Sequence, residues 1–173
     1  PATGGANGEY SFATGRSTTA SGNYSFASGY TSVASGDYSI SSGYGNVASG
    51  NWSTAIGNDN NSTQSASVAI GVSNDAAGVN ATAIGVGNTA SGYAAIAIGV
   101  FSTTVSGNTS SWVPTDRLFS IGNGTNSSSR SDALEILKNG AITAPSFDIA
   151  EITDDKALIT KEFADATYAA GTV

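Results

Sequence analysis

Glycine recurs every seven residues along the first hundred residues of this chain, and this spacing constrains the fold more than any other feature. Each glycine inside a helix costs about 1 kcal/mol relative to alanine, so a helical heptad is excluded. A fixed period of this kind indicates a repeat architecture. The grid consists of Gly8, Gly15, Gly22, Gly29, Gly36, Gly43, Gly50, Gly57, Gly71, Gly78, Gly85, Gly92 and Gly99, with Gln64 as its only exception.

The full repeat is 14 residues long, because the segments that end at alternate glycines resemble one another. Its seven copies read YSFATG, YSFASG, YSISSG, WSTAIG, ASVAIG, NATAIG and AAIAIG. Bulky and small residues alternate within each copy, which is the period of a β-strand. Each repeat is therefore expected to form two strands and two turns, with glycine supplying positive φ or close backbone approach at the corners. The turn glycines are Gly15, Gly29, Gly43, Gly57, Gly71, Gly85 and Gly99.

Stacked coils would place residues that are 14 positions apart in columns, with a spacing of about 4.8 Å. One such column is predicted to form a ladder of hydrogen-bonded amides; it contains Asn46, Asn60, Asn74 and Asn88. A second column is aromatic in its first four positions; it contains Tyr10, Tyr24, Tyr38 and Trp52.

Alternation gives each strand a bulky face and a small face. A solenoid of this kind buries little apolar surface per repeat and gains stability from association. We therefore expect one face to fill the coil and the other to lie partly against neighbouring chains. The residues predicted to pack in the core or in the seam between chains are Phe12, Phe26, Ile40, Val68, Ile70, Ile84, Ile96 and Ile98.

The repeat resembles the head of YadA-like trimeric autotransporter adhesins. The similarity rests on ASVAIG, NATAIG and AAIAIG, together with Ala-Ser-Gly at the half-repeat, and it covers residues 8–106. It implies a left-handed parallel β-roll assembled as a homotrimer. The first three copies depart from the pattern, because Thr14, Ser28 and Ser42 replace the apolar residue before glycine.

The last third of the chain is organised differently. The grid shifts by one at Gly107, so we expect a β-roll over residues 1–107, a β-hairpin trimerising or connector module over 108–152, and a short helical segment with a tail over 153–173. Residues 117–124 alternate and end on Asn-Gly. Residues 133–137 and 141–143 flank a second Asn-Gly, the strongest short hairpin signal. Thr153 is a candidate helix cap.

Three stretches of this region, RLFSIGNGT, SRSDALEILKNG and LITKEFADATY, resemble connector segments of trimeric phage-tail-type fibres and bacterial surface fibres.

The charge and composition exclude several classes of function. The net charge is −7, so the basic surface of a nucleic-acid binder is missing. The chain has no His and no Cys, which excludes Ser-His-Asp and Cys-His catalysis, the usual zinc sites and disulfides. No apolar run approaches the roughly 18 residues of a membrane span, so no membrane insertion is expected of this segment. No cofactor or metal is expected, and Pro1 suggests a piece of a longer protein.

Catalysis is not expected. Glycan-cleaving fibres use two acids about 5 to 9.5 Å apart, whereas the acids of the repeat region are far apart in sequence: Glu9, Asp37, Asp59 and Asp75. Asp154 and Asp155 fit the start of a helix better than a catalytic pair.

The aromatic column is the best binding candidate, because Tyr and Trp offer flat amphipathic faces to sugar rings. Tyr30 and Tyr44, just past their own corners, could add to this surface. The alternative is that the rings stack on one another as packing. Ice binding is disfavoured, because no row of threonines persists through the seven copies.

The sequence thus predicts a non-enzymatic homotrimeric fibre or adhesin head that attaches to a glycan or protein on a host or prey surface. Its expected location is the cell surface or extracellular space, as an outer-membrane-attached fibre, or a virion tail. Two alternatives remain open: a structural spacer within a longer fibre, and a phage-type tailspike that degrades polysaccharide.

Overall fold

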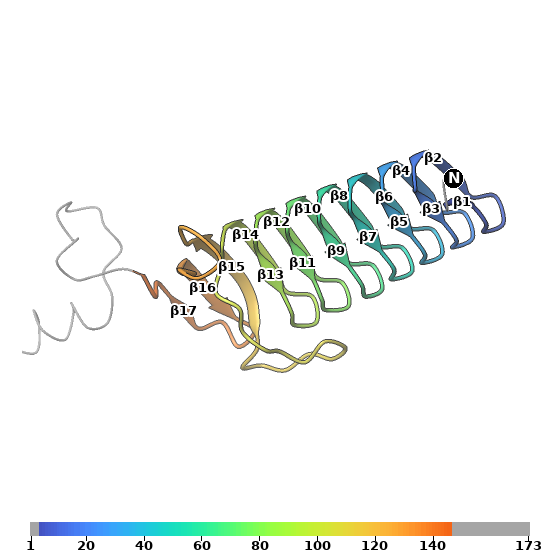
Figure 1. Ribbon diagram of the computed structural model, residues 1–173. Coiled ribbons are helices and arrows are strands. Elements are labelled where there is room, and N and C mark those ends of the chain that lie inside the picture. The colour runs from blue at the N-terminus through green and yellow to red at the C-terminus, as the bar shows by residue number, and fades with distance from the viewer. Residues whose placement is uncertain (1–3, 147–173) are drawn as a thin grey trace, which may run out of the picture.

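The structure is a computed structural model that describes residues 4–146, and it is an all-β roll of seven stacked coils (Figure 1). One sheet contains the short strands β1 (Gly5–Ala6), β3 (Thr19–Ala20), β5 (Val33–Ala34), β7 (Val47–Ala48), β9 (Asn61–Ser62), β11 (Asp75–Ala76) and β13 (Thr89–Ala90). The other begins with β2 (Phe12–Arg16), β4 (Phe26–Tyr30), β6 (Ile40–Tyr44), β8 (Thr54–Asn58), β10 (Val68–Val72), β12 (Thr82–Val86) and β14 (Ile96–Val100).

Neighbouring coils pair in parallel and are offset by 14 residues at every position. Between β10 and β12, for example, Val68 lies beside Thr82 and Gly71 lies beside Gly85. The predicted 14-residue repeat and the parallel β-roll are both confirmed.

Glycine plays two different parts at the corners. The glycines that end the long strands, Gly15 to Gly99 at 14-residue intervals, have φ between 98° and 122°, a region that other residues rarely adopt. The half-repeat glycines have no such φ, but close approach of the next coil requires glycine at five of them: Gly8, Gly22, Gly36, Gly50 and Gly78. A Cβ atom built on Gly22 would lie 2.0 Å from the carbonyl oxygen of Gly36 in the next coil. Both predicted roles of glycine are therefore present.

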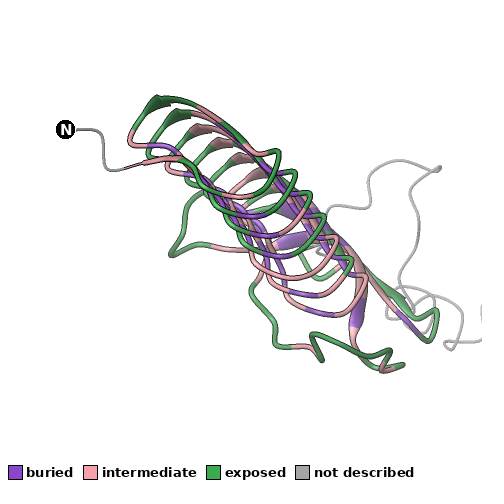
Figure 2. Cartoon of the chain, turned by 90° about the vertical axis from the view of Figure 1, so that its right-hand side faces the viewer, coloured by how far each residue is buried: buried purple, intermediate pink, exposed green. Residues whose placement is uncertain are grey.

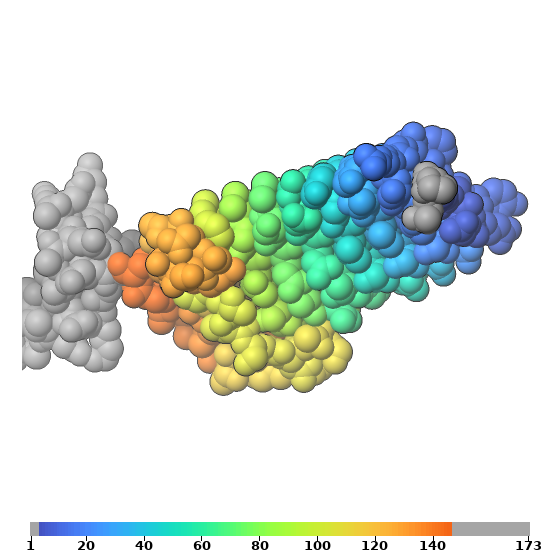
Figure 3. Space-filling model, in the orientation of Figure 1, coloured from blue at the N-terminus to red at the C-terminus, as the bar shows by residue number. Residues whose placement is uncertain are grey.

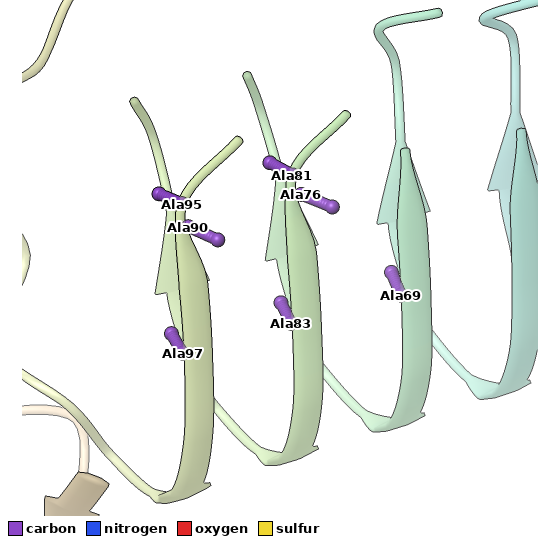
Figure 4. Packing of buried hydrophobic residues seen from close by; sticks show 7 residues of the cluster. All are labelled: Ala69, Ala76, Ala81, Ala83, Ala90, Ala95 and Ala97. Atoms are coloured by element: carbon purple, nitrogen blue, oxygen red, sulfur yellow. The ribbon is translucent and has the colours of Figure 1, made fainter. Parts of the chain in front are cut away.

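Small side chains fill the interior of the coils. Among residues 4–146 the buried apolar residues are alanines, and Figure 4 shows one cluster of them; serines and asparagines complete the interior. Figure 2 shows buried segments along the inside of the coils and exposed segments along their outer side. A coil of two short strands closed by tight corners leaves too little width for larger groups.

The bulky residues consequently lie on the outer face of the larger sheet, and Ile84 is 40% exposed in a single chain. Within one chain they are therefore not core residues; this applies to Phe12, Phe26, Ile40, Val68, Ile70, Ile84, Ile96 and Ile98.

The predicted asparagine ladder is confirmed. The Nδ2 atom of Asn60 lies 3.0 Å from Oδ1 of Asn46, 3.0 Å from the carbonyl oxygen of Ile56 and 2.7 Å from that of Gly71. Its own Oδ1 accepts the backbone N–H of Asn74 at 3.1 Å. All four asparagines are buried. The ladder satisfies buried backbone groups of three successive coils, which is what buried polar groups require.

The C-terminal strands continue the larger sheet. Strand β15 (Arg117–Asn123) pairs in parallel with β14 and places Phe119 beside Ile96 and Gly122 beside Gly99. It is thus an eighth copy of the long strand, displaced by an insertion. Strands β16 (Asp132–Leu137) and β17 (Ile142–Thr143) follow antiparallel and close this end of the rod (Figure 3, orange).

The predicted hairpin over 133–143 is confirmed by β16 and β17. The first Asn-Gly does not form a tight hairpin, because the chain returns from β15 to β16 through the longer segment 124–131. The predicted helix over 153–173 lies outside the described residues. In the described part of the chain, no helix is long and apolar enough to cross a bilayer.

We predict that Asn60→Ala lowers the free energy of unfolding by at least about 2 kcal/mol, because it leaves several buried backbone groups unpaired. Chemical denaturation followed by far-UV circular dichroism measures this loss. Asn61→Ala is the matched control, since the side chain of Asn61 has no hydrogen bond within residues 4–146. Equal losses for the two variants would contradict the importance of the ladder.

Candidate binding surface

Four aromatic rings stack along one corner of the roll. The ring centroids of Tyr10 and Tyr24 lie 5.2 Å apart, those of Tyr24 and Tyr38 5.0 Å, and those of Tyr38 and Trp52 6.0 Å. The last two pairs are within 6° of parallel. The structure thus brings together all four residues of the predicted aromatic column, which we call the corner ladder.

The backbone holds these rings in equivalent directions. Tyr24, Tyr38 and Trp52 have φ of 57° or 58°, a left-handed conformation that costs about 1–2 kcal/mol for a residue with a side chain. Ala66 and Asn80 adopt the same conformation at the next two corners, so the roll imposes it whatever the side chain. The stacking is a consequence of this repeated corner.

The corner ladder leaves ring edges, rather than most ring faces, open to solvent. Tyr24 and Tyr38, which have a ring on each side, are 49% and 50% exposed, whereas Tyr10 and Trp52 at the ends are 75% and 60% exposed. A sugar can therefore cover a ring face only at an end of the ladder. The surface available for stacking is smaller than the sequence predicted, because the inner rings cover one another.

Two further aromatic rows lie on the outer face of the larger sheet. Phe12 stacks on Phe26 at 5.6 Å, and Tyr30 stacks on Tyr44 at 5.2 Å, with the guanidinium of Arg16 5.4 Å from the Tyr30 ring. Sequence reasoning identified Tyr30 and Tyr44 but missed Arg16. Hydroxyl residues fill the space between the two rows; they are Thr14, Ser28 and Ser42.

The same outer face becomes aliphatic toward the C-terminal end. The position that holds Ser42 in the third coil holds isoleucine in the next four coils: Ile56, Ile70, Ile84 and Ile98. Valine occupies the neighbouring column at Val72, Val86 and Val100. A contiguous apolar face of this length on a single chain is a typical interaction surface.

A second polar ladder follows the corner ladder on its N-terminal side. The backbone N–H of Asn23 donates to Oδ1 of Asp37 at 2.9 Å, and that of Asp37 donates to Oδ1 of Asn51 at 3.1 Å. Asp37 is thereby a backbone acceptor, which gives it a structural role. The 14-residue spacing was the signal that could have revealed this row.

Arg117 forms ion pairs with Asp132 and Glu135 where the C-terminal strands meet the roll. Arg117 donates to Asp132 at 2.9 Å and to Glu135 at 3.3 Å, and also to the carbonyl oxygen of Thr103 at 2.9 Å. Asp132 and Glu135 are thus two carboxylates brought together, but both bind the same guanidinium. Each carboxylate accepts a hydrogen bond from the guanidinium, so both are held as partners of Arg117.

The acids of the repeat region do not gather into a site. Among residues 4–146, no group of three or more His, Cys, Asp and Glu side chains is placed to hold a metal ion. Asp154 and Asp155 lie outside the described residues. The corner ladder offers ring edges along its length and ring faces at its two ends.

A comparison with protein families agrees with this geometry. The family model described as the YadA head domain repeat (2 copies) matches residues 6–32, 20–46, 34–60, 48–74 and 76–102. These windows cover more than half of the chain. The chain belongs to the YadA head repeat family. Across residues 6–74 the matched segments begin 14 residues apart, at residues 6, 20, 34 and 48, so the YadA head repeat has the period of the roll. No curated protein sequence matches the chain.

Asp75 lies on the outer side of the smaller sheet of this YadA-type roll, in register with Asn61 and Thr89. Burial raises its pKa above the ordinary value of 3.8. The folded chain therefore favours the neutral acid, and stability falls as the pH rises through the range above 3.8.

We predict that Asp75→Asn stabilises the protein near neutral pH, because it removes the cost of a partly buried carboxylate. The gain should disappear as the pH falls below the folded-state pKa, where Asp75 itself is neutral. Thermal unfolding at about pH 7 and about pH 3 measures both values. Asp59→Asn, at an exposed corner, is the control. A gain of equal size at the two pH values would contradict this interpretation.

Proposed function

We propose that this chain is the head of a trimeric, non-enzymatic surface adhesin, which attaches its bearer to a glycan or protein on another surface. The observation that carries the proposal is the unbroken in-register roll of the YadA head repeat family, with isoleucine and valine left open to solvent on the outer face of its last four coils. The proposed location is the cell surface, as part of a fibre that projects outward.

The trimer is proposed on the outer face of the larger sheet. Several of its residues are about 40% exposed in a single chain, although they are aliphatic: Ile40, Ile56, Val72, Ile84, Ile96 and Val100. Burying such residues contributes about 1.5–3 kcal/mol each at full burial. Because the alanine-filled interior buries little apolar surface, association through this face adds to the stability of the single chain.

The corner ladder is proposed as the binding region. It is exposed, regularly spaced and flanked by amides and carboxylates, and aromatic side chains with polar groups are enriched at binding surfaces. A rigid rod that presents such a row suits attachment, and the sequence lacks the His and Cys of Ser-His-Asp and Cys-His hydrolases.

We predict that Ile84→Asp blocks assembly but leaves the single chain folded. The side chain faces outward in one chain, so the roll tolerates the charge, whereas a trimer seam would have to bury it at a cost of roughly 3 kcal/mol or more. Sedimentation equilibrium measures assembly, and circular dichroism checks the fold. A loss of more than about a hundredfold in the assembly constant is expected.

Ser49→Asp is the matched control, because Ser49 is an exposed turn residue that follows β7 of the smaller sheet. It should assemble as the unchanged protein does. If sedimentation equilibrium shows that the unchanged protein is a stable folded monomer, the trimer proposal is contradicted. Failure of an assembled trimer to attach to any cell or glycan surface would favour the spacer alternative.

A further inference from the structure

We propose that the face of Trp52 that points toward Ala66 binds one neutral pyranose ring, which occupies the next position of the corner ladder. The inference rests on the proposed adhesin function and names the class of ligand and its location. Its basis is a gap in an otherwise continuous row, since the corner column reads Tyr38, Trp52, Ala66, Asn80 and Ala94.

The gap at Ala66 is a missing ring rather than a change of backbone. Ala66 has φ 54° and Trp52 has φ 58°. The backbone N–H of each donates to a carbonyl oxygen of the preceding coil at 2.8 Å. Residue 66 therefore directs its Cβ as residue 52 does, and only the ring is lacking.

Trp52 consequently has one covered face and one open face. The Tyr38 ring covers the first, at 6.0 Å between centroids and 6° from parallel. On the other side the corner column offers only the methyl group of Ala66. This agrees with the 60% exposure of Trp52, against 50% for Tyr38, which has a ring on each side.

The gap has the thickness of one ring. Trp52 and Asn80 are two coils apart, which corresponds to roughly 9.6 Å at the spacing of paired strands. A ring in van der Waals contact on both faces needs roughly 7 to 8 Å. A pyranose ring can thus lie over Ala66, with its apolar face on the indole and the Asn80 amide on its far side.

The surroundings favour a neutral, hydroxyl-rich ligand. The corners of these three coils carry amides and a hydroxyl at Asn51, Gln64, Ser65 and Asn80. None of the corner residues 50–53, 64–67 and 78–81 carries a charge. Such groups pair with sugar hydroxyls, while the indole supplies the apolar surface that fixes ring orientation.

The test is a fluorescence titration of the assembled protein in a Trp112→Phe background, which leaves Trp52 as the only tryptophan. The probes are the methyl glycosides of glucose, galactose and N-acetylglucosamine. We expect a saturable change in Trp52 emission for at least one probe, with a dissociation constant of about 1 mM or weaker, as befits a single small sugar.

Ala66→Tyr is the decisive variant, because it completes the ladder and fills the site without removing Trp52. Tyr24 and Tyr38 show that tyrosine is accommodated at this φ. We expect the sugar-dependent change to fall at least tenfold. Ala94→Tyr makes the same substitution in the same column two coils farther on, and it should leave the titration unchanged.

Two outcomes would overturn the proposal: no saturable response to any probe, or an equal response in Ala66→Tyr and the unchanged protein. Sedimentation and cell attachment are measured on the same samples. If Ala66→Tyr trimers attach as well as the unchanged protein does, this site is rejected and the adhesin function still stands. If the unchanged protein itself fails to assemble or to attach, the adhesin function is rejected.

Discussion

The backbone hydrogen bonds that hold each residue above the one 14 positions later determine the rest of this molecule. They require the carbonyl oxygens of one coil to approach the next closely, and a Cβ atom at Gly57 would lie 2.1 Å from the oxygen of Gly71. They also place like side chains above one another. Such columns favour groups that attract their own kind, as amides and aromatic rings do, and disfavour charges, which repel at this spacing. The corner ladder, the asparagine ladder and the sparse charge of the roll share this one cause.

The same geometry selects different side chains for the two faces of each strand. The inward face accepts alanine and serine because the coil is narrow, so hydrogen bonding rather than bulky apolar packing organises the interior. The outward face carries the larger residues and is free to change along the rod. It changes from aromatic rows around Phe26 and Tyr30 to isoleucine and valine around Ile84 and Val86. One repeat can therefore keep its fold while its surface is altered coil by coil.

Much of this could be predicted from the sequence, because period, glycine spacing and alternation are local signals. They predicted the parallel roll, the Asn60 ladder and the meeting of Tyr24 with Tyr38. Alternation alone did not show which face is inside, since bulky residues usually fill a core and here the coil is too narrow for them. The eighth copy, Phe119 to Gly122, was hidden by the insertion before β15. The Arg117–Asp132 ion pair was missed because its partners meet only when the C-terminal strands fold back.

The reversal of direction at β16 gives the rod two unequal ends. Among residues 4–146 the larger sheet ends in β16, which is antiparallel to β15, and then in the two-residue β17, which is antiparallel to β16. A short edge strand is a poor template for pairing with another chain. Within the described residues, this end therefore offers another chain only a two-residue edge, whereas each coil of the roll offers its neighbour a five-residue strand. A protein made almost wholly of self-complementary repeats thus presents a poor template for end-to-end stacking here.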